Sequence, residues 1–210
     1  SFAQNKDDSI ARSFISGIAY DSRPYKIQLN IGQIIETDSF LGSKSSGIFQ
    51  LADEDVVTKF YSFDFAYKLS DDTQILGKYA HAFTDVDVHR NSIFTNFEEL
   101  ESNSMKFALV KDFNIKHQIG LSYSQPLRVN DGQLSIAVPV KKYVDGTILY
   151  EHDNVDLEPT GREKDWEVFY DYKLNDKEDI GGNLIYREDP GHVNAAQDEK
   201  AVLFKYTRKF

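Results

Sequence analysis

The sequence predicts an all-β protein, folded as an antiparallel, up-and-down β-barrel of about twelve strands. Three observations predict this fold. Apolar and polar residues alternate along most of the 210 residues, the connections between the alternating runs are short and long in turn, and the last run ends the chain on Phe210. At this length, and without a low-complexity linker, residues 1–210 are expected to form a single β-barrel domain.

Each predicted strand is a run in which one parity is mainly apolar and the other mainly polar, the pattern of a strand with one apolar face. About eleven such runs follow one another, each roughly ten residues long, which is the length of a tilted strand that spans a bilayer. They are 13–20, 26–35, 60–69, 75–83, 105–109, 115–123, 134–140, 147–156, 166–174, 180–187 and 201–210. One further strand before Ile10 would give twelve, an even number as expected of such barrels.

The clearest strands are 60–69 and 166–174, whose apolar parities are rich in aromatic residues. In a barrel of the bacterial outer-membrane type, the apolar parity contacts lipid and the polar parity faces the lumen. The residues expected to face lipid in these two strands are Tyr61, Phe63, Phe65, Tyr67, Trp166, Val168, Tyr170 and Tyr172. The polar parities carry mixed charges that would pair within a lumen or line a wet channel: Lys26, Asp64, Lys106, Asp112, Glu167, Asp171, Lys205 and Lys209.

The connections alternate in length. Short turns are predicted near Asp21, Ser70, Asn114, Asp145 and Asn175, and longer connections near Gly42, Asn91, Arg128, Thr160 and Gly191. Short turns on one rim and long loops on the other are typical of outer-membrane barrels. Within this scheme 126–132 is expected to be a loop, 91–100 is compatible with one or two helical turns, and Asp145-Gly146 is a strong hairpin signal.

The final strand gives the expected barrel a direction. Its C-terminal end falls on the rim with the short turns, which is the periplasmic rim in outer-membrane barrels. Phe204, Tyr206 and Phe210 share the apolar parity of this strand. They are predicted to form the signal that the barrel insertion machinery reads, with Phe210 as its principal residue.

Composition excludes several classes of protein. The net charge of −10 argues against binding to nucleic acid, because phosphate recognition needs a basic surface. The absence of cysteine excludes disulfide scaffolds, thiolate metal sites and thiol nucleophiles. No run of about 18 apolar residues is present, so no membrane-spanning helix is expected. The chain begins with Ser1 rather than Met, which indicates a processed or excised segment of a longer protein.

No pattern of catalytic, cofactor-binding or metal-binding residues is recognisable. The sequence lacks a G-x-S-x-G motif, a glycine-rich phosphate loop and a zinc-binding helix. Asp85, Asp87 and His89 could share a strand face and hold a cation, and the acidic clusters 53–55 and 98–99 could bind calcium, but solvated loops are the favoured interpretation for all three. The segment 158–163, which places Arg162 between acidic residues, is expected to be an ion-paired loop.

Four segments resemble the β domain that follows the catalytic domain of some bacterial subtilisin-like serine proteases. They are FLGSKSSGIFQL at 40–51, SQPLRVNDGQLSIAVPV at 124–140, LEPTGREKDWEVFYDYKL at 157–174 and DPGHVNAAQDE at 189–199. They occur in the family's order, and the similarity extends from about Ile31 to the end of the chain. The catalytic Ser, His and Asp of that family lie upstream, so none of them has a matching position in this sequence.

The resemblance implies a C-terminal, autotransporter-like domain in the bacterial outer membrane or at the cell surface. Such a domain would anchor, and help to export, its own N-terminal passenger, a subtilisin-like protease, and would need no cofactor. Its partners would be outer-membrane lipid, the insertion machinery and the passenger. The alternation also fits a soluble β-rich accessory module of a secreted protease, in which Tyr61, Phe63, Phe65 and Tyr67 would be shielded. A small pore is a third, less favoured interpretation.

Overall fold

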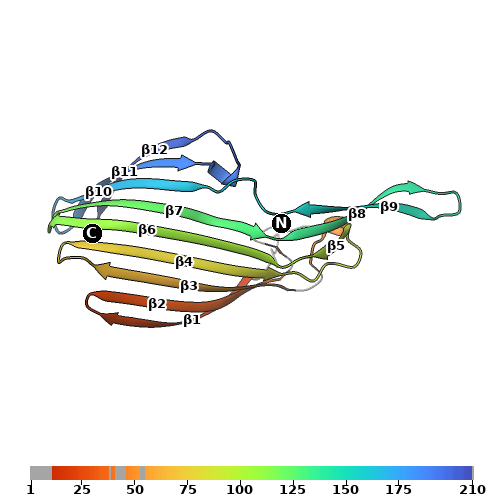
Figure 1. The fold of residues 1–210 in the computed structure, drawn as a ribbon, viewed down its shortest axis with the longest axis horizontal. Helices are drawn as coiled ribbons and strands as arrows, with labels where there is room; N and C mark the ends of the chain where they lie inside the picture. Colours follow the sequence, from red (N-terminus) through yellow and green to blue (C-terminus); the bar gives the residue numbers. More distant parts are fainter. Residues whose placement is uncertain (1–10, 38, 41–45, 53–54, 210) are drawn as a thin grey trace, which may run out of the picture.

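A computed structural model describes residues 11–37, 39–40, 46–52 and 55–209 (Figure 1). The fold is all-β and antiparallel, as predicted, and the described residues contain two short 3-10 helices but no α-helix. The strands are β1 (Ala11–Ser22), β2 (Tyr25–Glu36), β3 (Val56–Lys68), β4 (Thr73–Asp85), β5 (Phe94–Phe97), β6 (Leu100–Asn114), β7 (His117–Asp131), β8 (Gln133–Lys142), β9 (Ile148–Asp156), β10 (Lys164–Lys173), β11 (Glu178–Glu188) and β12 (Glu199–Arg208); the 3-10 helices are η1 (Gly47–Phe49) and η2 (Pro190–His192). No helix in this part of the chain is long and apolar enough to cross a lipid bilayer.

Nine strands form one sheet in the order β1-β2-β3-β4-β6-β7-β10-β11-β12, with every neighbouring pair antiparallel. Four tight turns join β1 to β2, β3 to β4, β6 to β7 and β10 to β11, and all lie at one end of the sheet (Figure 1). We call this the turn end, and the opposite end, which carries the longer connections, the loop end. β12 runs towards the turn end, as the sequence predicted for the last strand.

The sheet is not closed into a barrel. β1 and β12 lie at its two edges, and no pairing between them is present among the described residues. The described residues form twelve strands, of which nine share the main sheet. They include β5, which was not predicted, whereas the strand expected before Ile10 lies outside the described residues. The other three strands, β5, β8 and β9, form a separate sheet in which β8 pairs with β5 on one side and with β9 on the other.

The β8–β9 hairpin projects from the loop end (Figure 1). The predicted turn at Asp145-Gly146 is present. The prediction that it lies on the same rim as the other short turns was wrong. The expected loop at 126–132 is mostly strand, because β7 continues to Asp131 through an irregularity that accommodates Pro126. The stretch 91–100 forms β5 and the first residue of β6 rather than helical turns, since β5 pairs with β8.

The two faces of the main sheet differ in chemistry. Cross-strand pairs such as Leu29–Phe63, Leu109–Leu121 and Val168–Leu184 place apolar residues beside each other on one face, which we call the apolar face. The other, which we call the polar face, carries residues of the intervening parity, such as Asp64 opposite Lys78 and Lys106 opposite Ser124. Because side chains alternate along a strand, this separation follows from the sequence pattern.

Within the part of the chain that the structure describes, the cluster of buried apolar residues lies at the loop end. Leu51, Val56, Val86, Phe97 and Leu100 are buried together there. Partly buried residues that pack against them come from β5, β7, β8 and the connections: Phe40, Ala52, Val88, Phe94, Val129, Leu134 and Leu157. The loop end thus folds as a water-soluble protein does, with its apolar residues inside.

Candidate functional site

The apolar face is a continuous, solvent-accessible surface that crosses all nine strands of the main sheet. The stretch of outward apolar positions is about seven residues long on most strands, for example from Tyr61 to Tyr67 on β3 and from Trp166 to Tyr172 on β10. Its exposed members include Ile18, Leu29, Ile31, Tyr61, Phe63, Phe107, Leu109, Leu121, Trp166, Val168, Tyr170, Leu184, Val202, Phe204 and Tyr206. A patch of this extent is unusual for a soluble monomer.

Aromatic residues mark both ends of the apolar stretch. Tyr25 and Tyr67 stack at the turn end with ring centroids 5.1 Å apart. At the other end, Tyr123 and Trp166 contact each other across β7 and β10, with centroids 4.7 Å apart. The apolar surface is therefore bordered by amphipathic rings on both sides.

The eight residues predicted to face lipid all lie on the apolar face. Tyr61, Phe63, Trp166, Val168 and Tyr170 are exposed, and Phe65, Tyr67 and Tyr172 are partly buried against their neighbours. Phe204 and Tyr206 of the predicted assembly signal lie on the same face of the edge strand β12, where Phe204 is 89% exposed. Phe210 lies outside the described residues.

The polar face carries a ladder of paired side chains. Asn30 donates hydrogen bonds to Ser62 (3.0 Å) and Asp64 (3.4 Å), and the Asp64 carboxylate lies 3.6 Å from Nζ of Lys78. Further along the sheet, Glu167 lies 3.8 Å from Nζ of Lys106 and accepts hydrogen bonds from Ser122 (3.2 Å) and Asn183. Some of the mixed charges predicted on this parity therefore pair with one another. Lys26 pairs with Asp21 (3.1 Å).

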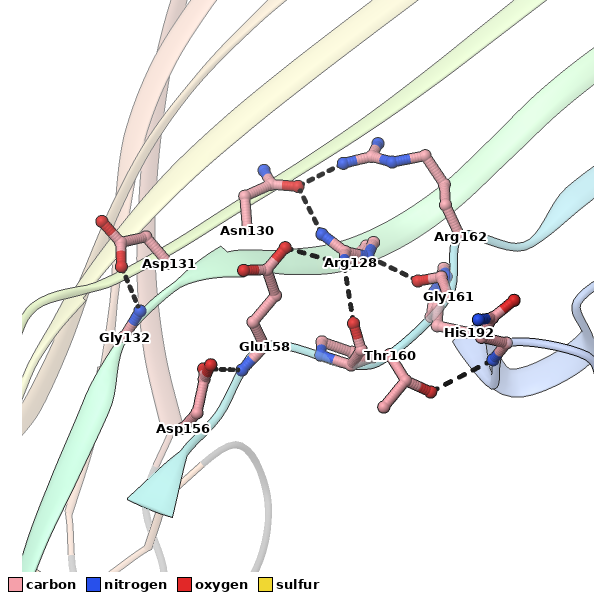
Figure 2. A network of polar contacts seen from close by, with 12 residues as sticks. Arg128, Asn130, Asp131, Gly132, Asp156, Glu158, Thr160, Gly161, Arg162 and His192 are labelled. Atoms are coloured by element: carbon pink, nitrogen blue, oxygen red, sulfur yellow. Dashed lines mark hydrogen bonds and ion pairs between the residues drawn. The ribbon is translucent and has the colours of Figure 1, made fainter. Parts of the chain in front are cut away.

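Arg128 is the centre of a polar cluster at the loop end of β7 (Figure 2). Its side chain is 9% exposed, and its guanidinium donates to Gly161 O (2.7 Å), Pro159 O (2.7 Å) and the Glu158 carboxylate (2.8 Å). Arg128 pairs with Asn103 in the β6–β7 ladder, on the same parity as the apolar face. The cluster therefore attaches the β9–β10 connection to the edge of the apolar face.

Arg162 and Glu163 extend this cluster. Arg162 donates to Asn103 (3.1 Å), Gln125 (3.1 Å) and Asn130. The expectation of an ion-paired loop at 158–163 is therefore right for Glu158, but Arg162 itself binds amide oxygens.

The buried Glu163 carboxylate accepts a hydrogen bond from Gly191 N (2.6 Å) and lies 3.0 Å from Nε of Arg187. His192 receives a hydrogen bond from Glu163 N (2.9 Å) and contacts Leu127 O (2.9 Å). We call the set Arg128, Glu158, Arg162, Glu163, Arg187 and His192 the rim network.

Three of the four segments noted in the sequence meet in the rim network, since Arg128, Arg162 and His192 belong to 124–140, 157–174 and 189–199 respectively. The fourth, 40–51, is described only in part and contributes Phe40 and Leu51 to the loop-end core. Sequence reasoning missed the network because its members are separated by up to about 65 residues. The signal available in the sequence was that charged residues stand close to Gly and Pro along each segment.

The described residues contain no group of three or more His, Cys, Asp or Glu that could hold a metal ion. Asp53 and Glu54 lie outside the described residues, so that acidic cluster has no structural account. In the β3–β4 turn, hydrogen bonds from Ser70 (2.6 Å) and Thr73 (3.0 Å) lower the pKa of the Asp72 carboxyl, with a smaller contribution from the charge of Lys111.

No protein-family description matches the chain, and a search of curated proteins also found no match.

Proposed function

We propose that this domain is an outer-membrane β-barrel that anchors an N-terminal passenger and helps to export it. The observation that carries the proposal is the apolar face, which crosses the main sheet and has exposed apolar residues on every one of its strands except β4, where they are partly buried. In lipid such a face is stable only when every backbone group is paired, which strands of a barrel achieve.

The dimensions of the apolar face support a membrane location. Seven residues at about 3.3 Å each extend for about 20 Å along a strand. Outer-membrane barrels have an apolar band about 25 Å tall, with aromatic residues at both of its borders. The aromatic pairs Tyr25–Tyr67 and Tyr123–Trp166 stand at the two borders here. The paired charges of the polar face are suited to a wet lumen.

The proposal requires the sheet to close. β1 and β12 run in the same direction, because an odd number of antiparallel strands separates the two edges. Direct pairing between them would therefore be parallel, whereas one further strand between them would make ten strands that are antiparallel throughout. Even strand numbers are the rule in bacterial single-chain barrels.

The proposal of a passenger rests on the family resemblance of the four segments. They suggest a subtilisin-like protease upstream, with no enzyme activity in this domain itself. Lipid, the insertion machinery and the passenger are the proposed partners, and the outer membrane or cell surface is the proposed location. Three of these segments belong to one hydrogen-bonded network at the loop end. This supports treating them as one structural unit, whatever its evolutionary origin.

Membrane fractionation and heat-modifiable migration in detergent gels test the barrel. We expect the chain to remain in the membrane pellet after alkaline washing, and to migrate faster unheated than boiled. A chain that stays soluble and monomeric without detergent would contradict the proposal.

Deletion of Phe210 tests the assembly signal separately. The insertion machinery would read the last strand before the barrel forms, so we expect the deletion to reduce the amount assembled. The urea resistance of barrels already inserted should change less. Pulse-chase assembly measures the first quantity and urea titration the second. Equal assembly of the deleted and complete chains would contradict the role of Phe210.

A soluble accessory module of a secreted protease is the second candidate. The loop-end core favours it, because Val56 and Leu100 are buried there as in a soluble domain. That function needs another protein surface over Tyr61 and Phe63, which are exposed in this structure. Labelling from the lipid phase separates the candidates, since Tyr61→Cys and Phe63→Cys should react with a lipid-dissolved maleimide only in a barrel.

A further inference from the structure

The Arg162 side chain holds a positive charge at the loop-end border of the apolar face. It is partly buried, and it donates to the amide oxygens of Asn103 (3.1 Å), Gln125 (3.1 Å) and Asn130, the last of which Figure 2 shows. All three acceptors are neutral. Within the described part of the chain these bonds occupy three of the five N–H donors of the guanidinium, which leaves two for a further acceptor.

The carboxylates around Arg162 have other cations as partners. Glu158 pairs with Arg128 (2.8 Å), and Glu188 pairs with Lys164 (3.3 Å). Neither of these two carboxylates is therefore the counterion of Arg162. A partly buried guanidinium that is held only by amides favours an anionic ligand, because a charged acceptor forms stronger hydrogen bonds than a neutral one.

The Arg162 guanidinium is fixed beside the aromatic border of the apolar face. Asn103 and Gln125 stand on the same parity as that face, on β6 and β7. Gln125 is 9% exposed, and it also donates to the hydroxyl of Tyr123 (2.6 Å). The Tyr123 ring in turn contacts Trp166. The charge of Arg162 and the aromatic rings at the edge of the apolar surface are thus joined through one buried amide.

Three further cations stand at the loop-end border, and we call them the border cations: Arg12, Lys59 and Lys200. Each lies on the parity of the apolar face, two residues before the first outward apolar residue of β1, β3 or β12. All three are exposed. None of them is in an ion pair with a carboxylate of the described residues. Their charges are therefore available to an external anion.

The turn-end border of the same face is different. Lys111 of β6 lies 3.7 Å from the Asp72 carboxylate, and Arg208 of β12 lies 3.6 Å from Glu178. The cations that the strands place at this border thus have carboxylate partners within the chain. The two borders share aromatic rings but differ in how their cations are paired.

We propose that the loop-end border binds the phosphate headgroup of an anionic membrane lipid, with Arg162 as the principal contact. A guanidinium matches phosphate in geometry and charge. The lipid chains would lie on the apolar face beside Tyr123 and Trp166, and the border cations would attract further headgroups of the same kind. This inference rests on the proposed function, because a face in contact with lipid is what brings headgroups to this border.

The test uses Trp166 as the reporter, since it is the single tryptophan of the chain. The 210-residue chain is folded into phosphatidylcholine nanodiscs that contain increasing fractions of a lipid with brominated acyl chains, which quench tryptophan on contact. The brominated lipid is phosphatidylglycerol in one series and phosphatidylcholine in the other. We expect half-maximal quenching at about a fivefold lower fraction of phosphatidylglycerol. Added salt should reduce this preference, because it screens the attraction between charges.

Three variants separate the charge of Arg162 from its structural role. Arg162→Gln keeps a polar side chain and removes the charge, so most of the preference for phosphatidylglycerol should be lost. Arg162→Lys keeps the charge and should retain more than half of the preference. Lys111→Gln removes a cation from the turn-end border of the same face and should leave the preference unchanged.

Three results would overturn the headgroup site. They are equal quenching by the two lipids, a full preference in Arg162→Gln, and an equal loss in Arg162→Gln and Arg162→Lys, which would indicate damage to the rim network. Inorganic phosphate should reduce the preference no more than chloride does at the same ionic strength. A larger reduction by phosphate would assign the site to the free anion and contradict the lipid proposal.

Failure of this site and failure of the proposed function give different results in the same experiment. Equal quenching of Trp166 by both brominated lipids removes the headgroup site and leaves the membrane location standing. If neither lipid quenches Trp166, the apolar face does not contact lipid, and the proposed membrane location fails together with the site.

Discussion

The two ends of this molecule use apolar residues in opposite ways. At the loop end, Val56 and Leu100 are buried beneath connections and pack against one another. Along the strands, residues of the same kinds, such as Leu109 and Val168, stand on an exposed face. β6 takes part in both arrangements, with Leu100 in the core and Leu109 on the apolar face. The proposed membrane location would account for this difference, because the apolar face would then contact lipid while the loop-end core excludes water.

The largest expected difference in stability is between two leucine truncations on β6, one in the loop-end core and one on the apolar face. Leu100→Ala removes a side chain that is 3% exposed, and we expect a loss of about 2–5 kcal/mol because a cavity remains. Leu109→Ala, on the exposed face, should cost clearly less, since lipid can fill the space. Denaturant titration in lipid measures both. Equal losses would mean that the two faces are packed alike.

A charge placed on the apolar face should have the next largest effect. Phe63→Arg lies near the middle of the apolar stretch, and lipid exposure predicts a cost of about 2–4 kcal/mol. Gln33→Arg, beyond the border on β2, should cost about 0–1 kcal/mol. Folding into liposomes at increasing urea measures the difference. A soluble domain would tolerate both changes similarly, because an exposed arginine is readily hydrated.

The rim network should be the next sensitive feature. Arg128→Ala leaves the carbonyls of Pro159 and Gly161 without their donor, and we expect a loss of about 1–3 kcal/mol. Amide hydrogen exchange should rise in the β9–β10 connection and at the base of the β8–β9 hairpin. Arg23→Ala, in the β1–β2 turn at the opposite end, is the matched control. Unchanged exchange in the β9–β10 connection would show that the network does not hold it.

The smallest effect should come from the β3–β4 turn. Ser70→Ala removes the principal hydrogen bond to the Asp72 carboxylate, so the pKa of Asp72 should rise towards its ordinary value. A carboxyl whose pKa is lowered by folding stabilises the fold above its unfolded-state pKa, and that contribution is lost as pH falls through the folded-state pKa. The difference between wild type and variant should therefore be present at neutral pH and vanish in acid. NMR titration of Asp72 measures the shift, and an unchanged pKa would contradict the assigned cause.

Local pattern was sufficient to predict most of the strands and their faces, although it missed β5 and the last part of β7. The parity of Tyr61, Phe63 and Trp166 placed them correctly on one face, because a strand has a fixed period of two. The same pattern could not predict the extent of the main sheet. A hairpin signal such as Asp145-Gly146 identifies a turn but carries no information about which sheet the hairpin joins.

Pro126 shows a second limit of local reasoning. Proline usually interrupts a strand, and the loop expected at 126–132 rested on that rule together with Gly132. The ladder between β6 and β7 instead shifts its register around Pro126 and continues. The hydrogen-bond partners of Arg128 come from the β9–β10 connection, which is distant in the sequence. The rim network could therefore not be predicted from neighbouring residues.

The continuity of β7 with β8 has a mechanical consequence. Only Gly132 separates the two strands, and the hairpin projects beyond the loop end (Figure 1). A pull on its tip would be transmitted along the length of β7, which is paired on both sides by β6 and β10. Ladder hydrogen bonds lie across the strands, so such a force would load many of them in shear at once rather than peel them one by one. Tension applied to the hairpin and directed away from the sheet would therefore be shared by the whole β7 ladder.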